Sequence, residues 1–156
     1  MKVREFYDFA RKNLPLADEK ELKNEANILL QFCLKLDFTE LFLQRERTLT
    51  EKELEFLENA IFLRKSGVPV QYILGSWEFM NMNLKVGEGV LIPREDTAVL
   101  VEEVIKNASS SKYLNLIDLC SGTGCVALAL EKNLEDFNEI CALEYSEKAF
   151  EYLSEN

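Results

Sequence analysis

The segment best suited to chemistry is an apolar run followed by a turn that contains two glycines. Leu114–Leu119 has the composition of a buried strand, and the turn Cys120–Gly124 follows it directly. Glycine lets a backbone approach a ligand closely because no Cβ stands in the way. A second strand, Glu139–Glu144, ends in a carboxylate twenty positions after Gly124. An acidic residue at that spacing commonly reaches ribose hydroxyls, so the pattern predicts a site for a nucleoside-containing ligand.

The residues of the turn exclude two other nucleotide-binding loops. The dinucleotide fingerprint requires glycine where Cys120 and Cys125 stand, and no Gly-Lys-Ser/Thr follows as in a Walker loop. The remaining pattern, Asp118 followed four positions later by Gly-x-Gly, resembles motif I of S-adenosylmethionine-dependent methyltransferases. Two interpretations without a ligand stay open: a purely structural turn, and Glu144 as an exposed acid at a strand end.

Composition excludes several kinds of catalysis. The 156 residues include no histidine, which removes Ser-His-Asp and Cys-His catalysis and histidine-ligated zinc or haem. Only two of the four cysteines lie close together, so we expect no metal site and interpret all four as packing residues. No apolar run approaches the ~18 residues of a membrane span, and the chain opens on a polar segment. These features predict a cytoplasmic protein with reduced thiols and no membrane contact.

The charge is unevenly distributed. Residues 1–75 hold 12 basic and 13 acidic side chains, whereas residues 76–156 hold 6 and 15, so the net charges are −1 and −9. The second half therefore offers no basic surface for nucleic acid, and we expect no direct nucleic-acid partner. Five basic residues of the first half form either a partner surface or a solvated helical surface: Arg4, Arg11, Lys12, Arg45 and Arg47.

The elements that position the site begin with a small helical bundle. Apolar residues recur at helical spacing from Val3, and capping patterns at Asp18 and Thr50 each start a further helix. A short helix is expected around Phe38–Phe42, and Ser66-Gly67 ends the last one. Four helices with short connections follow from this pattern.

The second half alternates strands and helices. Trp77–Met80 and Leu84–Val86 predict a hairpin. A helix is expected from about Glu95 to Lys106, with Val99, Leu100, Val104 and Ile105 facing inward. A loop closes it at residues 108–111, and a last helix is expected over Ser146–Ser154. The predicted fold class is α/β: a helical bundle, a β-hairpin linker and the first part of a Rossmann-like sheet.

Three sequence blocks resemble the HemK/PrmC family, the protein-(glutamine-N5) methyltransferases of peptide chain release factors. Gly67–Gly75 with the following Trp-Glu-Phe is similar to the family's interdomain segment. Leu91–Thr97 resembles its I-P-R-x-[DE]-T-E signature, with Ala98 in place of the final Glu, and Leu116–Leu130 is similar to its motif I. The resemblance implies a substrate-docking domain over 1–75, a hairpin linker over 76–92, and the N-terminal part of a cofactor domain over 93–156.

The resemblance also implies a cofactor, a partner and a set of site residues. The cofactor is S-adenosylmethionine, and the partner is a peptide chain release factor. The ribose is assigned to Glu144 and the adenine to the neighbourhood of Tyr145, while Arg94 and Thr97 are placed near the cofactor pocket. The residues assigned to the methionine moiety are Asp118, Cys120, Ser121, Gly122, Thr123 and Gly124. An ion pair between Arg94 and a neighbouring acid, Glu95 or Asp96, remains the alternative.

The family's catalytic Asn-Pro-Pro-Tyr is absent from these 156 residues, because no two of the three prolines are adjacent. We therefore expect no catalytic residue here, no methylation by this chain alone, and a sheet truncated after two strands. Such a chain is either a truncated product or one half of a site that another chain completes. Two other functions stay open: a non-catalytic adaptor, and an adenine methyltransferase of nucleic acids, which the charge of −9 disfavours.

Overall fold

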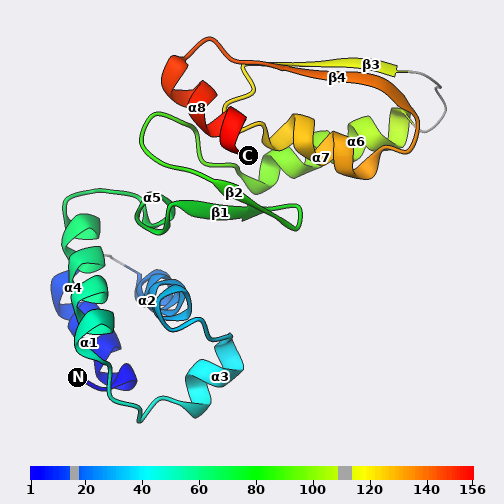
Figure 1. Cartoon of the computed structure of the whole chain (residues 1–156). Helices are drawn as coiled ribbons and strands as arrows, with labels where there is room; N and C mark the ends of the chain where they lie inside the picture. Colours follow the sequence, from blue (N-terminus) through cyan, green and yellow to red (C-terminus); the bar gives the residue numbers. More distant parts are fainter. Residues whose placement is uncertain (15–17, 109–113) are drawn as a thin grey trace. The chain divides into compact units, whose positions relative to one another are not determined.

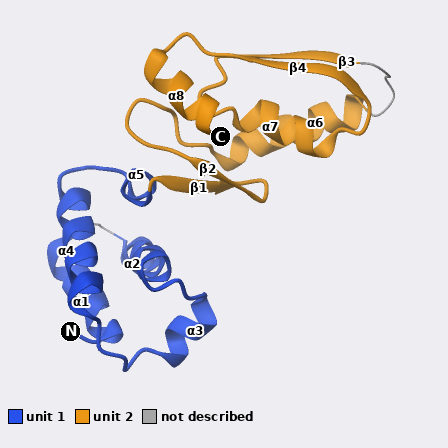
Figure 2. Cartoon of the chain, viewed as in Figure 1, with its two compact units in different colours: residues 1–74 blue, residues 75–156 orange. Residues whose placement is uncertain are grey.

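A computed structural model describes residues 1–14, 18–108 and 114–156 (Figure 1). The chain forms two compact units, residues 1–74 and 75–156 (Figure 2). The hairpin belongs to the second unit, because the boundary falls between Leu74 and Gly75. The roles given to residues 1–75, 76–92 and 93–156 stay predictions. In the described ranges no helix is both long enough and apolar enough to cross a membrane.

The first unit is a helical bundle. Its helices are α1 (Val3–Asn13), α2 (Glu19–Leu34), α3 (Phe38–Leu43), α4 (Glu51–Lys65) and α5 (Val70–Leu74). The predicted caps are confirmed, since Asp18 accepts a hydrogen bond from the Lys20 amide at 2.9 Å and Thr50 forms a capping box with Glu53. α5 was not expected, because its β-branched residues favoured extended structure.

The bundle packs around large apolar side chains and one ion pair. Phe6, Leu29, Leu30 and Leu57 are fully buried. Two hydrogen bonds of 2.8 Å join the Arg64 guanidinium on α4 to the Glu25 carboxylate on α2, and the same guanidinium donates to the Val68 carbonyl at 2.9 Å. Arg64 therefore holds α4 against α2 and fixes the position of the segment that follows α4.

The second unit begins with an antiparallel hairpin, β1 (Ser76–Phe79) and β2 (Met82–Lys85), in which Trp77 pairs with Leu84. Its turn residues Met80 and Asn81 both have positive φ, +46° and +59°, as a type I′ turn requires. The Lys132 ammonium donates to the Asn81 carbonyl at 2.9 Å.

A parallel strand pair follows, β3 (Leu114–Leu119) and β4 (Phe137–Leu143), with Leu119 opposite Leu143. The helices of this unit are α6 (Glu95–Ala108), α7 (Cys125–Asn133) and α8 (Glu147–Glu155). α6 and α7 lie along one face of the pair (Figure 1), and Val101 and Ala129 are fully buried in the core of this unit. The expected order of helical bundle, hairpin and parallel strands is confirmed.

Two details of the predicted packing are wrong. α6 turns Val101 into the core, whereas Val99 and Leu100 are 60% and 56% exposed. The inward face follows Ala98, Val101 and Ile105, which share one side of a helix with 3.6 residues per turn. β3 is not buried on both faces either, since every second residue from Asn115 to Leu119 is exposed and α6 and α7 cover only the other face. Of the loop predicted at 108–111, Ala108 ends α6 and the remainder lies outside the described residues.

Candidate functional site

The glycine turn is anchored across the ends of both parallel strands. The Ser121 amide donates to the Leu143 carbonyl at 3.0 Å, and its hydroxyl donates to the Asp118 carbonyl at 2.8 Å. Gly124 has φ of +78°, and a Cβ there would lie 2.6 Å from Leu153 Cδ1 on α8. Glycine is thus favoured at this position, because it adopts the left-handed conformation without strain and leaves room for Leu153.

Glu144 stands beside this turn because Leu119 and Leu143 are partners in the sheet register. One carboxylate oxygen accepts the Gly122 amide at 2.8 Å, and the other accepts the Ser146 amide at 2.8 Å. These hydrogen bonds, that from Ser146 most and that from Gly122 next, lower the pKa of Glu144 below its ordinary value. The side chain is therefore an ionised acceptor, and each oxygen keeps lone-pair capacity for a hydroxyl donor.

Asp118, which the resemblance assigns to the methionine moiety, makes a structural contact within the protein. Its carboxylate accepts the Ala127 amide at 3.3 Å, in the first turn of α7. Gly124, at the N-cap of α7, has no side chain to supply this acceptor. Asp118 thus caps α7 from the end of β3, which holds the turn between them in place.

The remaining predicted residues of the turn differ in exposure. Thr123 is only 2% exposed, whereas Cys120 and Tyr145 face solvent, Tyr145 almost completely. The prediction that all four cysteines are packing residues is wrong for Cys120, whose φ of +62° lies in the left-handed region at the exposed start of the turn. Burial raises the pKa of Cys125, and the nearby Asp118 charge adds to the effect. Across the described ranges, no cluster of potential metal-binding side chains is present.

A residue outside every predicted motif also contacts the turn. The Asn156 side-chain amide donates to the Thr123 carbonyl at 3.0 Å and to the Lys85 carbonyl at 3.2 Å, and its oxygen accepts the Lys85 amide at 2.6 Å. Asn156 therefore ties the end of β2 to the glycine turn. No motif marks it, because the contact depends on chain segments 33 and 71 positions away.

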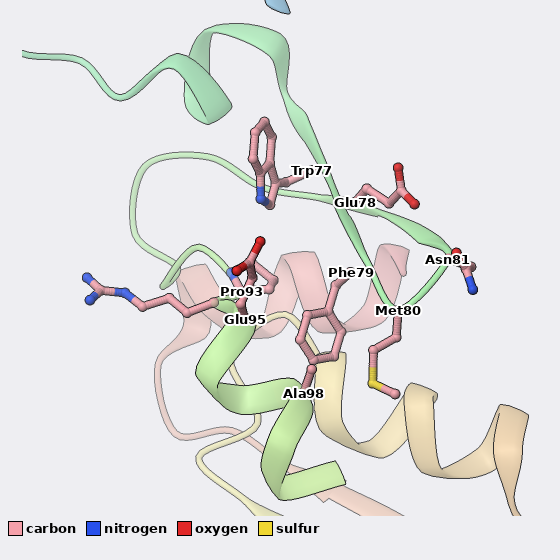
Figure 3. Close-up of a pocket in the computed structure, with 9 residues that line it drawn as sticks. Trp77, Glu78, Phe79, Met80, Asn81, Pro93, Glu95 and Ala98 are labelled. Atoms are coloured by element: carbon pink, nitrogen blue, oxygen red, sulfur yellow. The ribbon is translucent and has the colours of Figure 1, made fainter. Parts of the chain in front are cut away.

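The Pro-Arg segment lies at a separate hollow of the second unit. A cavity of about 470 Å³ lies between β1 and the beginning of α6 (Figure 3). Its lining consists of Trp77, Glu78, Phe79, Met80, Asn81, Pro93, Arg94, Glu95 and Ala98. Figure 3 shows Trp77 and Phe79 on the hairpin side and Glu95 and Ala98 on the helix side. None of these described lining residues belongs to the glycine turn.

Arg94 lines this hollow and is exposed. The alternative interpretation, an ion pair of Arg94 with Glu95 or Asp96, is not supported, since no such pair forms between these described residues. Thr97 is half-buried in the first turn of α6, where its amide donates to the Arg94 carbonyl at 3.0 Å. The structure therefore brings Asp118, the turn and Glu144 together at the strand ends, while Arg94 and Thr97 lie at the beginning of α6.

The chain is similar to a set of known proteins. Residues 5–75 match the PrmC N-terminal domain. The release factor glutamine methyltransferase of Thermodesulfovibrio yellowstonii is 38% identical over 134 residues, which cover 85% of this chain and 47% of that protein. That of Clostridium acetobutylicum is 32% identical over 142 residues, 91% of this chain and 50% of the relative. That of Koribacter versatilis is 34% identical over all of this chain and 55% of its own length. The chain thus spans about half the length of the curated relatives it matches.

Proposed function

Because the chain belongs to the family of the release factor glutamine methyltransferases, we propose that it forms the docking unit and half of the cofactor site of such an enzyme. The reaction proposed for the whole enzyme is S-adenosylmethionine-dependent methylation of the N5 atom of a glutamine side chain in a peptide chain release factor. The protein would then act in the cytoplasm.

The observation that carries the proposal is the ionised Glu144 beside the glycine turn. Carboxylate oxygens of this kind accept hydrogen bonds from the two hydroxyls of a ribose. A Cβ at Gly122 would have only Val90 Cγ2, at 3.7 Å, near it among the described atoms, so the space beside the turn is open to a ligand. These features fit a nucleoside ligand at the strand ends.

Each proposed site residue has a distinct part. Glu144 orients the ribose, and exposed Tyr145 flanks the adenine. Asp118 and the turn Cys120–Gly124 face the methionine moiety, with Ser121 holding the turn against β4. Arg94 and Thr97, at the beginning of α6, are proposed to lie near the cofactor pocket, as the resemblance implies. When bound, S-adenosylmethionine supplies an electrophilic methyl group on a positively charged sulfur.

These 156 residues hold no Asn-Pro-Pro-Tyr, so the groups proposed to orient the target amide are not among them. Orientation of that amide supplies proximity, which converts a slow bimolecular step into a fast one. We therefore expect this polypeptide to bind cofactor and protein substrate but not to transfer the methyl group.

Calorimetric titration of the 156-residue chain with S-adenosylhomocysteine tests the cofactor site. We expect saturable binding that Glu144→Gln weakens at least tenfold, while Glu151→Gln, a change of an exposed acid on α8, leaves it within twofold. Trp77 fluorescence establishes that each variant is folded. A folded wild-type chain that does not bind, or a Glu144→Gln variant with unchanged affinity, refutes the proposed site. Incubation with labelled S-adenosylmethionine and a release factor is expected to give no labelled product.

A further inference from the structure

A second hollow lies entirely within the helical unit. It is a groove of about 250 Å³ lined by Val3, Arg4, Tyr7, Lys23, Asn27, Phe38, Leu41, Phe42 and Arg45. Val3 and Leu41 form a buried apolar floor, exposed to only 1% and 2%. The Tyr7 hydroxyl donates to the Asn27 side-chain oxygen at 2.6 Å, which fixes α1 against α2 at the groove. The groove is therefore a preformed feature of the packed bundle.

The apolar rim of this groove is unusually exposed. Phe38 and Phe42, both on α3, are 63% and 62% exposed, and the adjacent Leu43 is 76% exposed. Leu41 is the one buried residue of this six-residue helix. Three large apolar side chains within one short helix mark a binding surface more often than scattered exposed residues do.

The ionisable cationic side chains that line the groove have no acidic counterpart within the described lining itself. Its described lining contains three cations, Arg4, Lys23 and Arg45, and no acid, although the whole chain carries a net charge of −10. Arg4 is paired with Glu46 at 2.6 Å, and Lys23 lies 3.7 Å from Glu19 in an exposed pair of small energetic weight. The Arg45 guanidinium lies 5.3 Å from the centroid of the Phe42 ring, so a cation and an aromatic surface adjoin each other.

Size and charge together select the kind of occupant. Pockets for small ligands usually measure about 300–1,000 Å³, so a groove of about 250 Å³ suits one or two side chains of a larger partner. Nucleic acid is disfavoured, because specific phosphate binding usually needs several unpaired cations and residues 1–75 carry a net charge of −1. Apolar anchors flanked by carboxylates complement exposed phenylalanines flanked by arginine and lysine.

We propose that this groove binds an acidic amphipathic segment of a protein partner, with an apolar side chain over Val3 and Leu41 and a carboxylate beside Arg45. Resting on the proposed function, we assign that segment to the release factor substrate. The groove would then hold the substrate at a point outside the glycine turn and its strand ends.

Two probes separate these two parts of the proposal. The first is a labelled 14-residue amphipathic peptide with Leu anchors at helical spacing and flanking Glu residues, and its matched peptide carries Lys at every Glu. The second probe is a bacterial release factor. The groove variants are Phe42→Ser and Arg45→Glu, both at exposed positions, and the matched controls are Phe62→Ser and Lys52→Glu on α4. Fluorescence anisotropy with the full 156-residue chain gives the affinities.

We expect each groove variant to weaken binding of the acidic peptide and of the release factor at least tenfold, and each control to change it less than twofold. The Lys peptide should bind wild type at least tenfold more weakly than the Glu peptide and should prefer Arg45→Glu. Equal affinity of all variants for both probes overturns the groove. So does a 12-nucleotide RNA that competes with the peptide, or self-association of the chain that Arg45→Glu abolishes.

Failures of the two parts are distinguishable. If the release factor binds wild type and the groove variants equally, the groove is wrong and the proposed function stands. If the acidic peptide binds as expected but the release factor does not bind, the groove stands and the assignment of the partner is wrong.

Discussion

Replacement of Gly124 by alanine should destabilise the second unit through two separable effects. The residue has φ of +78°, and a left-handed conformation costs an L-residue about 1–2 kcal/mol. The new Cβ would lie 2.6 Å from Leu153 Cδ1, and moving that side chain off its rotamer costs about 1 kcal/mol more. We therefore expect Gly124→Ala to reduce the free energy of unfolding by about 2–3 kcal/mol. Urea unfolding followed by the fluorescence of Trp77, the one tryptophan of the chain, measures the free energy of unfolding of the second unit.

The matched control is Gly75→Ala in the same unit. Gly75 has φ of +72° but no atom within 4 Å of an added Cβ, so its substitution isolates the backbone cost of about 1–2 kcal/mol. In a double-mutant cycle, Gly124→Ala should reduce the free energy of unfolding less in the Leu153→Ala background than in the wild type, because the steric part of its effect is then absent. Equal losses for Gly124→Ala and Gly75→Ala would refute the packing argument. No loss for either would refute the backbone argument.

Three further outcomes are expected. Arg64→Ala should lower the free energy of unfolding by about 2–4 kcal/mol, because it leaves the largely buried Glu25 carboxylate unpaired. Arg11→Ala, which removes an exposed pair, should lower it by under about 0.5 kcal/mol. Denaturation followed by far-UV circular dichroism measures both, and similar losses for the two variants would contradict this reasoning. Because the pKa of Glu144 lies below its ordinary 4.5, its contribution to stability is complete above that value and is lost as the pH falls through the lowered pKa. The difference in urea midpoint between wild type and Glu144→Gln should therefore shrink below pH 4.5, and a constant difference would contradict the assignment. Iodoacetamide should modify exposed Cys120 well before buried Cys125, as mass spectrometry of the labelled peptides will show. The variant Cys120→Ser should lose the fast phase of labelling. Equal labelling rates of the two cysteines would show that the turn is not held as described.

Local signals predicted much of the fold. The caps of α2, α4 and α8 each depend on one polar side chain that satisfies nearby backbone amides, so Asp18, Thr50 and Ser146 mark helix starts in the sequence itself. The facing of α6 was not predictable in the same way. Val99, Leu100 and Val101 are all apolar, and only packing against α7 and the hairpin decides which of them is buried.

The candidate site was predicted only where local signals specify it. The turn, Asp118 and Glu144 follow from a strand–turn–helix pattern whose spacing is visible along the chain. The bond from the Gly122 amide to Glu144 depends on strand register, which no local pattern encodes. The sequence did not reveal the groove on the helical unit, because its lining comes from three helices and the segment after them. Among the basic residues of the expected partner surface, only Arg45 lies beside the aromatic rim without an ion pair to a described acid.

The Asn156 contacts have a consequence for the order in which the chain acquires structure during synthesis. The helical unit is complete at residue 74, so it can fold while the remainder is still being translated. The hydrogen bonds that join Lys85 and Thr123 to Asn156 form only when residue 156 has left the ribosome. At about 5–20 residues per second, translation of residues 75–156 separates these events by roughly 4–16 s. The nascent helical unit is thus available to a partner, or to a chaperone, several seconds before Asn156 can join β2 to the glycine turn.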